Sequence, residues 1–196
     1  MSGMSDEPLM VLIGGPNGAG KTTLASGLLP TLGLSQFVNA DNIARGMTED
    51  VEAVAVQAGR AMLLQLRSLV VQRESFAFES TLASRTFAKF VADGKEAGYR
   101  FLLYYVWVPT AEVSLHRVAR RVRAGGHNVP PDDIRRRHAR SAANFFSLYQ
   151  PLADGWLVFE NPEGAPHQVV AAGTGNRVHW VSNEELWNSL RSAGQG

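Results

Sequence analysis

Short apolar runs alternate with longer amphipathic stretches along most of the chain. Runs of about four to eight apolar residues have the length of strands, whereas apolar positions repeated every three or four residues indicate helices. The predicted strands lie at 9–13, 35–39, 75–79, 101–108, 156–159, 168–171 and 178–181. The predicted helices lie at 21–29, 49–74, 86–97, 111–123 and 131–148, and a last one begins at Asn183. Strands that alternate with helices predict an α/β fold with a parallel sheet flanked by helices.

A glycine-rich segment joins the first predicted strand to the first helix and carries the pattern Gly15-x4-Gly20-Lys21-Thr22. This is the P-loop pattern, in which glycines let the backbone N–H groups converge on nucleotide phosphates. Lys21 would contact the β/γ-phosphates, and Thr22 would offer its hydroxyl to Mg²⁺. We therefore expect ATP or GTP with Mg²⁺ as cofactors. The expected nucleotide-binding residues are Gly15, Pro16, Asn17, Gly18, Ala19, Gly20, Lys21, Thr22, Thr23 and, in a later turn, Asn161.

The bulk composition narrows the class of protein. The chain has 196 residues, of which 45% are hydrophobic, and this suits one domain over 9–191 with loose ends at 1–8 and 192–196. Its formal net charge of +1 does not indicate a general polyanion binder, and its lack of cysteine excludes disulfides and thiol catalysis. No apolar run approaches the ~20 residues of a membrane span, so we expect a cytoplasmic protein without a membrane partner.

Two carboxylates follow predicted strands. Asp41 comes just after the second strand and Glu79 ends the third, so a parallel sheet would bring both to the edge that carries the P-loop. Asp41 would take a proton from an attacking hydroxyl or hold Mg²⁺ through water. Glu79 would contact substrate or the water shell of Mg²⁺. The alternatives are that Asp41 caps the next helix and that Glu79 is a solvated edge residue.

Arginines are concentrated in one stretch of the chain. The cluster comprises Arg117, Arg120, Arg121, Arg123, Arg135, Arg136, Arg137 and Arg140. Two helices joined by the Gly125-Gly126 loop would form a lid over about 117–140 that closes on phosphates. Its arginines would neutralise charge on a transferred phosphoryl group. The alternatives are two solvated helix faces and a nucleic-acid-binding surface; Asp132 and Asp133 within the stretch argue against nucleic acid.

Four segments together resemble the zeta-toxin-like P-loop kinases, in their compact, stand-alone branch. They are 13–23, 37–41, 78–82 and 117–130, followed by the arginines of 134–137. The resemblance implies an ATP- or GTP-dependent kinase, whose substrate in the toxins is a UDP-linked N-acetyl amino sugar, and an antitoxin-type protein partner. It also implies roles for individual residues. Asp41 would be the general base, Glu79 a substrate or metal-shell group, and Arg121 with Arg136 or Arg137 the clamp on the transferred phosphate.

The sequence thus predicts a Mg²⁺-dependent phosphotransferase that moves the γ-phosphate of ATP or GTP to a hydroxyl of a small molecule. Two other functions fit the same motifs. One is a nucleotide-dependent ATPase or switch with a protein or nucleic-acid partner, and the other is a polynucleotide 5′-hydroxyl kinase. Acceptor-independent hydrolysis of ATP would favour the switch.

Overall fold

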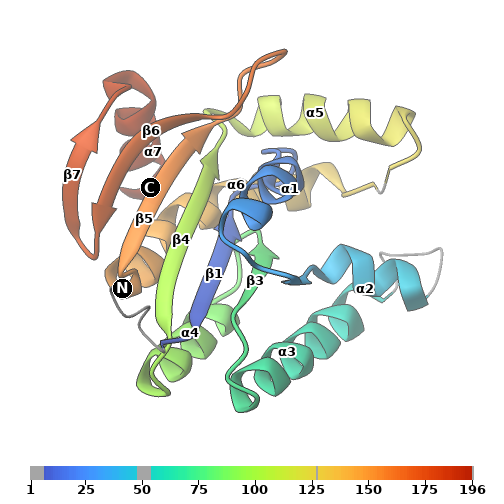
Figure 1. Ribbon diagram of the computed structural model, residues 1–196. Helices are drawn as coiled ribbons and strands as arrows, with labels where there is room; N and C mark the ends of the chain where they lie inside the picture. Colours follow the sequence, from blue (N-terminus) through green and yellow to red (C-terminus); the bar gives the residue numbers. More distant parts are fainter. Residues whose placement is uncertain (1–6, 48–53, 127, 196) are drawn as a thin grey trace.

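The computed structural model describes residues 7–47, 54–126 and 128–195, which build a seven-stranded sheet (Figure 1). The strands are β1 (Leu9–Gly14), β2 (Gln36–Val38), β3 (Phe76–Ser80), β4 (Arg100–Trp107), β5 (Gly155–Glu160), β6 (Gln168–Thr174) and β7 (Arg177–Val181). Their order across the sheet is β2-β3-β1-β4-β5-β6-β7. Strand β1 is the middle one of the five strands β2-β3-β1-β4-β5, so the P-loop that follows it lies at the middle of their carboxyl edge.

The predicted parallel sheet comprises β2, β3, β1, β4 and β5, and two antiparallel strands extend it at one edge. Strand β6 pairs antiparallel with β5, and β7 pairs antiparallel with β6. The reason lies in the connections, because a parallel crossover needs about a dozen residues or more. Residues 161–167 and 175–176 are too few for such a crossover, so the chain turns back at both places.

Helices cover both faces of the sheet. They are α1 (Lys21–Thr31), α2 (Ala40–Met47), α3 (Ala55–Val71), α4 (Thr86–Glu96), α5 (Ala111–Arg123), α6 (Pro131–Asn144) and α7 (Glu184–Gln195). Alternate residues of β1 enter two separate cores: Met10 and Leu12 pack with side chains of α3, α4 and α7, whereas Val11 and Ile13 pack with α1. This two-sided burial explains why the first strand is apolar at every position.

Several predicted boundaries differ from the structure. Helix α6 ends at Asn144 and continues as a π-helical turn, Phe145–Tyr149, where a helix to residue 148 was predicted. Helix α3 begins at Ala55, and residues 49–53 of the helix predicted from 49 lie outside the described residues. Of the tail predicted to be loose at 192–196, residues 192–195 form the last turn of α7, in which Ala193 packs against the core, and residue 196 lies outside the described residues. Of the loose start predicted for 1–8, residues 1–6 also lie outside the description, and Pro8 is buried.

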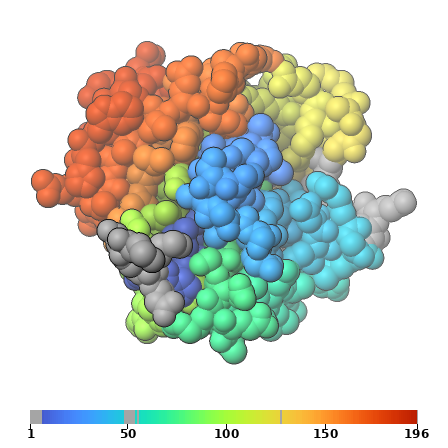
Figure 2. Space-filling view, in the orientation of Figure 1, coloured from blue at the N-terminus to red at the C-terminus, as the bar shows by residue number. Residues whose placement is uncertain are grey.

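No helix in the described ranges is long and apolar enough to cross a membrane. The space-filling view shows α1 at the surface, between the C-terminal strands and α2 (Figure 2). The parallel strands β1, β2 and β3 end at the same edge of the sheet as the start of the P-loop, and this edge holds the candidate site.

Candidate active site

The P-loop joins β1 to α1 in a conformation that requires glycine. Gly15 has φ 142° and Gly20 has φ 98°, values that side-chain-bearing residues rarely adopt. A Cβ on Gly15 would lie 2.3 Å from the carbonyl oxygen of Val106, and one on Gly20 would lie 2.2 Å from Nδ2 of Asn161. Helix α1 starts at Lys21 without a side-chain cap. A helix start of this kind, with no side-chain cap on its first N–H groups, is a common place for an anion to bind.

Glu79 connects the strand ends to the P-loop. Its Oε2 accepts hydrogen bonds from Thr22 Oγ1 at 2.8 Å and from Asn39 Nδ2 at 3.0 Å. Its Oε1 lies 3.7 Å from Lys21 Nζ, and the two side chains are only 11% and 8% exposed. Glu79 is therefore partnered and nearly buried, and the alternative of a solvated edge residue does not describe it.

Lys21 is held in the loop by two kinds of contact. Its ammonium donates to the carbonyl oxygen of Pro16 at 3.1 Å and faces Glu79. Burial lowers the pKa of Lys21, while the nearby carboxylates of Glu79 and Asp41 act in the opposite direction. Asp41 therefore lies within electrostatic reach of the P-loop lysine. It sits in the first turn of α2, where its own N–H donates to Asn39 Oδ1 at 2.7 Å.

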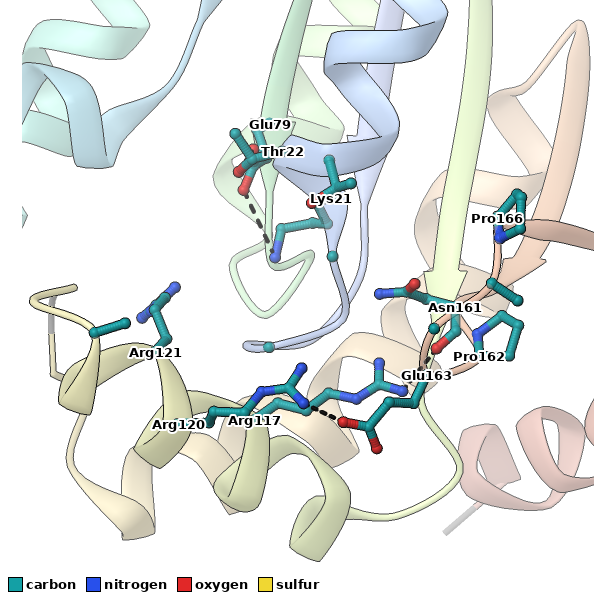
Figure 3. A pocket seen from close by; sticks show the side chains of 16 residues that line it. Lys21, Thr22, Glu79, Arg117, Arg120, Arg121, Asn161, Pro162, Glu163 and Pro166 are labelled. Atoms are coloured by element: carbon teal, nitrogen blue, oxygen red, sulfur yellow. Dashed lines mark hydrogen bonds and ion pairs between the residues drawn. The ribbon is translucent and has the colours of Figure 1, made fainter.

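A cavity of about 680 Å³ opens beside the P-loop, and α5 forms its other wall (Figure 3). Its charged lining consists of Lys21, Glu79, Arg117, Arg120, Arg121 and Glu163. The remaining lining includes Gly18, Gly20, Thr22, Thr23, Ala124 and the turn 161–166. Figure 3 shows Lys21, Thr22 and Glu79 on one side of the gap and the three arginines of α5 on the other. Volume and charge suit a phosphorylated ligand.

Asn161 ties the turn after β5 to the P-loop. Its Nδ2 donates to the carbonyl oxygen of Ala19 at 2.9 Å, and its own carbonyl accepts from Arg117 at 2.7 Å. Arg120 forms an ion pair with Glu163 in the same turn. Burial and the neighbouring Arg120 lower the pKa of Arg117. These contacts join α5, the turn and the P-loop into one wall of the cavity.

Most of the predicted site residues lie at the cavity or in the P-loop, and three of them lie in neither place. The cavity lining includes Gly18, Gly20, Lys21, Thr22, Thr23, Glu79, Arg121 and Asn161, while Gly15, Pro16, Asn17 and Ala19 form the rest of the loop. Asp41 lies near Lys21 but outside the lining. Arg136 and Arg137 lie on α6 and pair with Asp133, at 2.7 and 3.3 Å. The structure therefore does not bring these two arginines to the cavity.

Sequence reasoning missed Asn39, Arg117, Arg120 and Glu163 as site residues. Asn39 stands immediately before α2, a helix that was not among those predicted, so its N-cap position was not recognised from the sequence. The two arginines were counted within the lid, but periodicity alone did not show which face of α5 meets the P-loop. Glu163 lies in a turn whose path no local pattern determines.

The donor set bears on which metal could bind. In the described ranges, no group of three or more His, Cys, Asp or Glu side chains is placed to hold a metal ion. The hydroxyl oxygen of Thr22 and a carboxylate oxygen of Glu79 nevertheless lie 2.8 Å apart on the wall of the cavity. Both are hard oxygen ligands, the kind that Mg²⁺ prefers. Mg²⁺ in nucleotide sites commonly uses only one or two protein ligands, together with phosphates and water. The residues present fit that ion.

Comparison with known proteins finds a family match and a curated relative. A sequence model described as Zeta toxin matches residues 3–163, which is most of the chain. An uncharacterized protein of Haemophilus influenzae is 29% identical over 125 residues, which cover 63% of this chain and 88% of that protein.

Several solved structures share the fold. The crystal structure of AvrRxo1-ORF1:-ORF2 with ATP matches 95% of this chain with a TM-score of 0.76 and 19% identity, and this chain spans 64% of that one. A structure of the PezAT toxin-antitoxin system of Streptococcus pneumoniae matches with a TM-score of 0.68 and 15% identity. The match covers 97% of this chain and 85% of that one. Shikimate kinase from Acinetobacter baumannii, in complex with shikimate, matches with a TM-score of 0.53 and 23% identity. The match covers 81% of this chain and 86% of that one. These likenesses confirm the predicted fold class, a mostly parallel sheet flanked by helices.

Proposed function

The chain belongs to the Zeta toxin family and has the fold of P-loop kinases, and from this premise we propose that it is a Mg²⁺-dependent phosphotransferase. It would move the γ-phosphate of ATP or GTP to a hydroxyl of a small molecule, for which a nucleotide sugar is the class that the family resemblance suggests. The observation that carries the proposal is the meeting of Lys21, Thr22 and Glu79 at a cavity whose far wall is lined by arginines.

The charges around the cavity support a nucleotide as the donor. Four cationic and two anionic side chains line it, which leaves an excess of two positive charges. This excess matches the charge of a nucleoside triphosphate bound to one Mg²⁺. A nitrogen of Arg117 is also buried without a hydrogen-bond partner among the described residues. A ligand oxygen in the cavity would satisfy this donor.

The metal would be held at the P-loop. Thr22 would coordinate Mg²⁺ directly, and Glu79 or Asp41 would contact it through water. When bound, the ion neutralises charge on the β- and γ-phosphate oxygens.

Two groups would act on the reacting atoms. Asp41 would accept the proton of the acceptor hydroxyl as its oxygen bonds to the γ-phosphorus. The bond from that phosphorus to the β-phosphate oxygen then breaks, which releases the nucleoside diphosphate. Arg121, which lies near Lys21, would neutralise the charge on the transferred group. Arg117 and Arg120 stand beside it on α5, whereas Arg136 and Arg137 would act only if α6 moved toward the cavity.

A protein partner of the antitoxin type is part of the proposal. Its support is that two structures with this fold, AvrRxo1-ORF1:-ORF2 and PezAT, are described as a two-component complex and a toxin-antitoxin system. Co-purification of the chain with the product of a neighbouring gene would test this partner directly.

The proposed activity is tested by incubating the chain with γ-labelled ATP and a metabolite extract, and asking which compound gains phosphate. The Asp41→Asn variant should bind nucleotide normally but transfer phosphate roughly 10²- to 10⁴-fold more slowly, because it lacks the base. Asp93→Asn is the matched control, since Asp93 is an exposed residue of α4 that pairs with Lys89. Hydrolysis of ATP at the same rate without any acceptor would favour the nucleotide switch instead.

A further inference from the structure

Asn39 contacts both carboxylate-bearing segments of the site with one side chain. It stands between β2 and α2 and is 7% exposed. Its amide nitrogen donates to Glu79 Oε2 at 3.0 Å, and its amide oxygen accepts from the N–H of Asp41 at 2.7 Å. One planar amide thus spans the ends of β2 and β3 and the start of α2.

The two contacts require a donor and an acceptor at fixed places. An aspartate at position 39 would still accept from the N–H of Asp41, but it would set a carboxylate against Glu79 at about hydrogen-bond distance. A serine would still cap α2, but its shorter side chain would not reach Glu79. Asparagine therefore satisfies both partners, and no other small side chain offers the same pair of atoms.

Thr22 shares the Glu79 oxygen that Asn39 holds. Thr22 Oγ1 lies 2.8 Å from Glu79 Oε2, and under the proposed function this hydroxyl turns to Mg²⁺ when nucleotide binds. Asn39 then remains as the uncharged donor on that oxygen. It also remains at the N-terminus of α2, where it orients the turn that carries Asp41.

We propose that Asn39 is a positioning residue that sets the relative placement of Glu79 and Asp41 for phosphoryl transfer. This inference rests on the proposed function. It predicts that changes at position 39 slow transfer more than they weaken nucleotide binding, because Asn39 does not line the nucleotide cavity.

A melting experiment tests the contact itself, without any substrate. Asn39→Asp should lower the melting temperature by roughly 3–10 °C, since two carboxylates would then face each other. Asn39→Asp is also measured in a Glu79→Gln background, with Glu79→Gln alone as the reference, because Glu79→Gln by itself removes the counter-charge of Lys21. In that background the repulsion is absent, so Asn39→Asp should cost less than half of the loss that it causes in the wild type. Asn42→Asp is the matched control, because Asn42 is exposed on the helix that Asn39 caps and its amide oxygen accepts from Arg45 at 3.4 Å. An equal loss from Asn39→Asp in both backgrounds would overturn the inference.

A kinetic experiment then separates positioning from a purely structural role. Asn39→Ser keeps the cap of α2 and should fold, yet it should lower kcat by roughly 10- to 100-fold. The dissociation constant of a fluorescent ATP analogue should change by less than about threefold. A serine variant that folds and keeps the wild-type kcat would overturn the positioning role. Failure of the proposed function itself would appear in the wild-type chain, as no phosphate transfer to any acceptor, and the melting result would still decide whether Asn39 holds Glu79.

Discussion

Adding one methyl group at either of two glycines near the P-loop should change stability in opposite directions. At Gly15 the new Cβ would lie 2.3 Å from the backbone oxygen of Val106, in the buried strand β4, and φ is 142°. Strained backbone costs about 1–3 kcal/mol and overpacking costs about 1–3 kcal/mol, so Gly15→Ala should lower the free energy of unfolding by about 2–6 kcal/mol. At Gly27, within α1, nothing lies within 4 Å of the new Cβ. Gly27→Ala should raise the free energy of unfolding by about 0.5–1 kcal/mol.

Thermal and urea unfolding of the two variants measure these changes. For a domain of this size, about 1 kcal/mol corresponds to a change of about 2–4 °C in melting temperature. Gly15→Ala should therefore melt roughly 4–24 °C below the wild type, and Gly27→Ala roughly 1–4 °C above it. A Gly15→Ala variant as stable as the wild type would refute the close approach of the P-loop to β4. Destabilisation by Gly27→Ala would refute the open helical position.

Three further predictions concern charged or titratable side chains. Lys21→Met should weaken nucleotide binding roughly 10- to 150-fold in a fluorescence titration, with the exposed Lys89→Met as control, because a charge-assisted contact is lost. Arg121→Ala should lower kcat by roughly 100-fold or more, whereas Arg136→Ala should cost less than about threefold; equal losses would mean that α6 reaches the phosphates. Burial lowers the pKa of His138 below 6.5, so the unfolded chain binds more protons than the folded one just below pH 6.5. Stability should therefore fall as the pH drops through that window, and His138→Gln should flatten the slope in urea unfolding at pH 5.5 and 7.5.

The spacing of apolar residues predicted most of the helices and strands, because each of them buries one face or one run of its own side chains. Helix α5 has the predicted bounds, 111–123, and Thr110 caps it through a hydrogen bond from the N–H of Val113. The antiparallel β6–β7 hairpin was predicted as two strands but not as a reversal of direction. Strand direction depends on how the chain crosses the sheet, and apolar spacing carries little information about that.

Residues of the predicted site lie together where the motif itself sets the geometry. The P-loop residues lie together, and Glu79 reaches them, because the carboxyl ends of parallel strands share one edge of the sheet. The roles of the arginines were harder to predict. Arg121 and Arg136 belong to one basic stretch of sequence, but Arg121 lines the cavity whereas Arg136 pairs with Asp133 on α6. Which face of a helix meets a cavity depends on tertiary packing, which local apolar spacing does not report. Asn39 was missed because its partner Glu79 lies 40 residues further along the chain.

Glu79 supplies a counter-charge to the nearly buried P-loop lysine. A charged ammonium at 8% exposure needs a counter-charge, and the carboxylate of Glu79 lies 3.7 Å away. The same carboxylate accepts the Thr22 hydroxyl, so it holds the two P-loop side chains that phosphate and metal would contact. Under the proposed function, an incoming phosphate would replace Glu79 as the partner of Lys21. Binding would then exchange one set of charge pairs for another, and Asn39 would keep Glu79 in place while this exchange occurs.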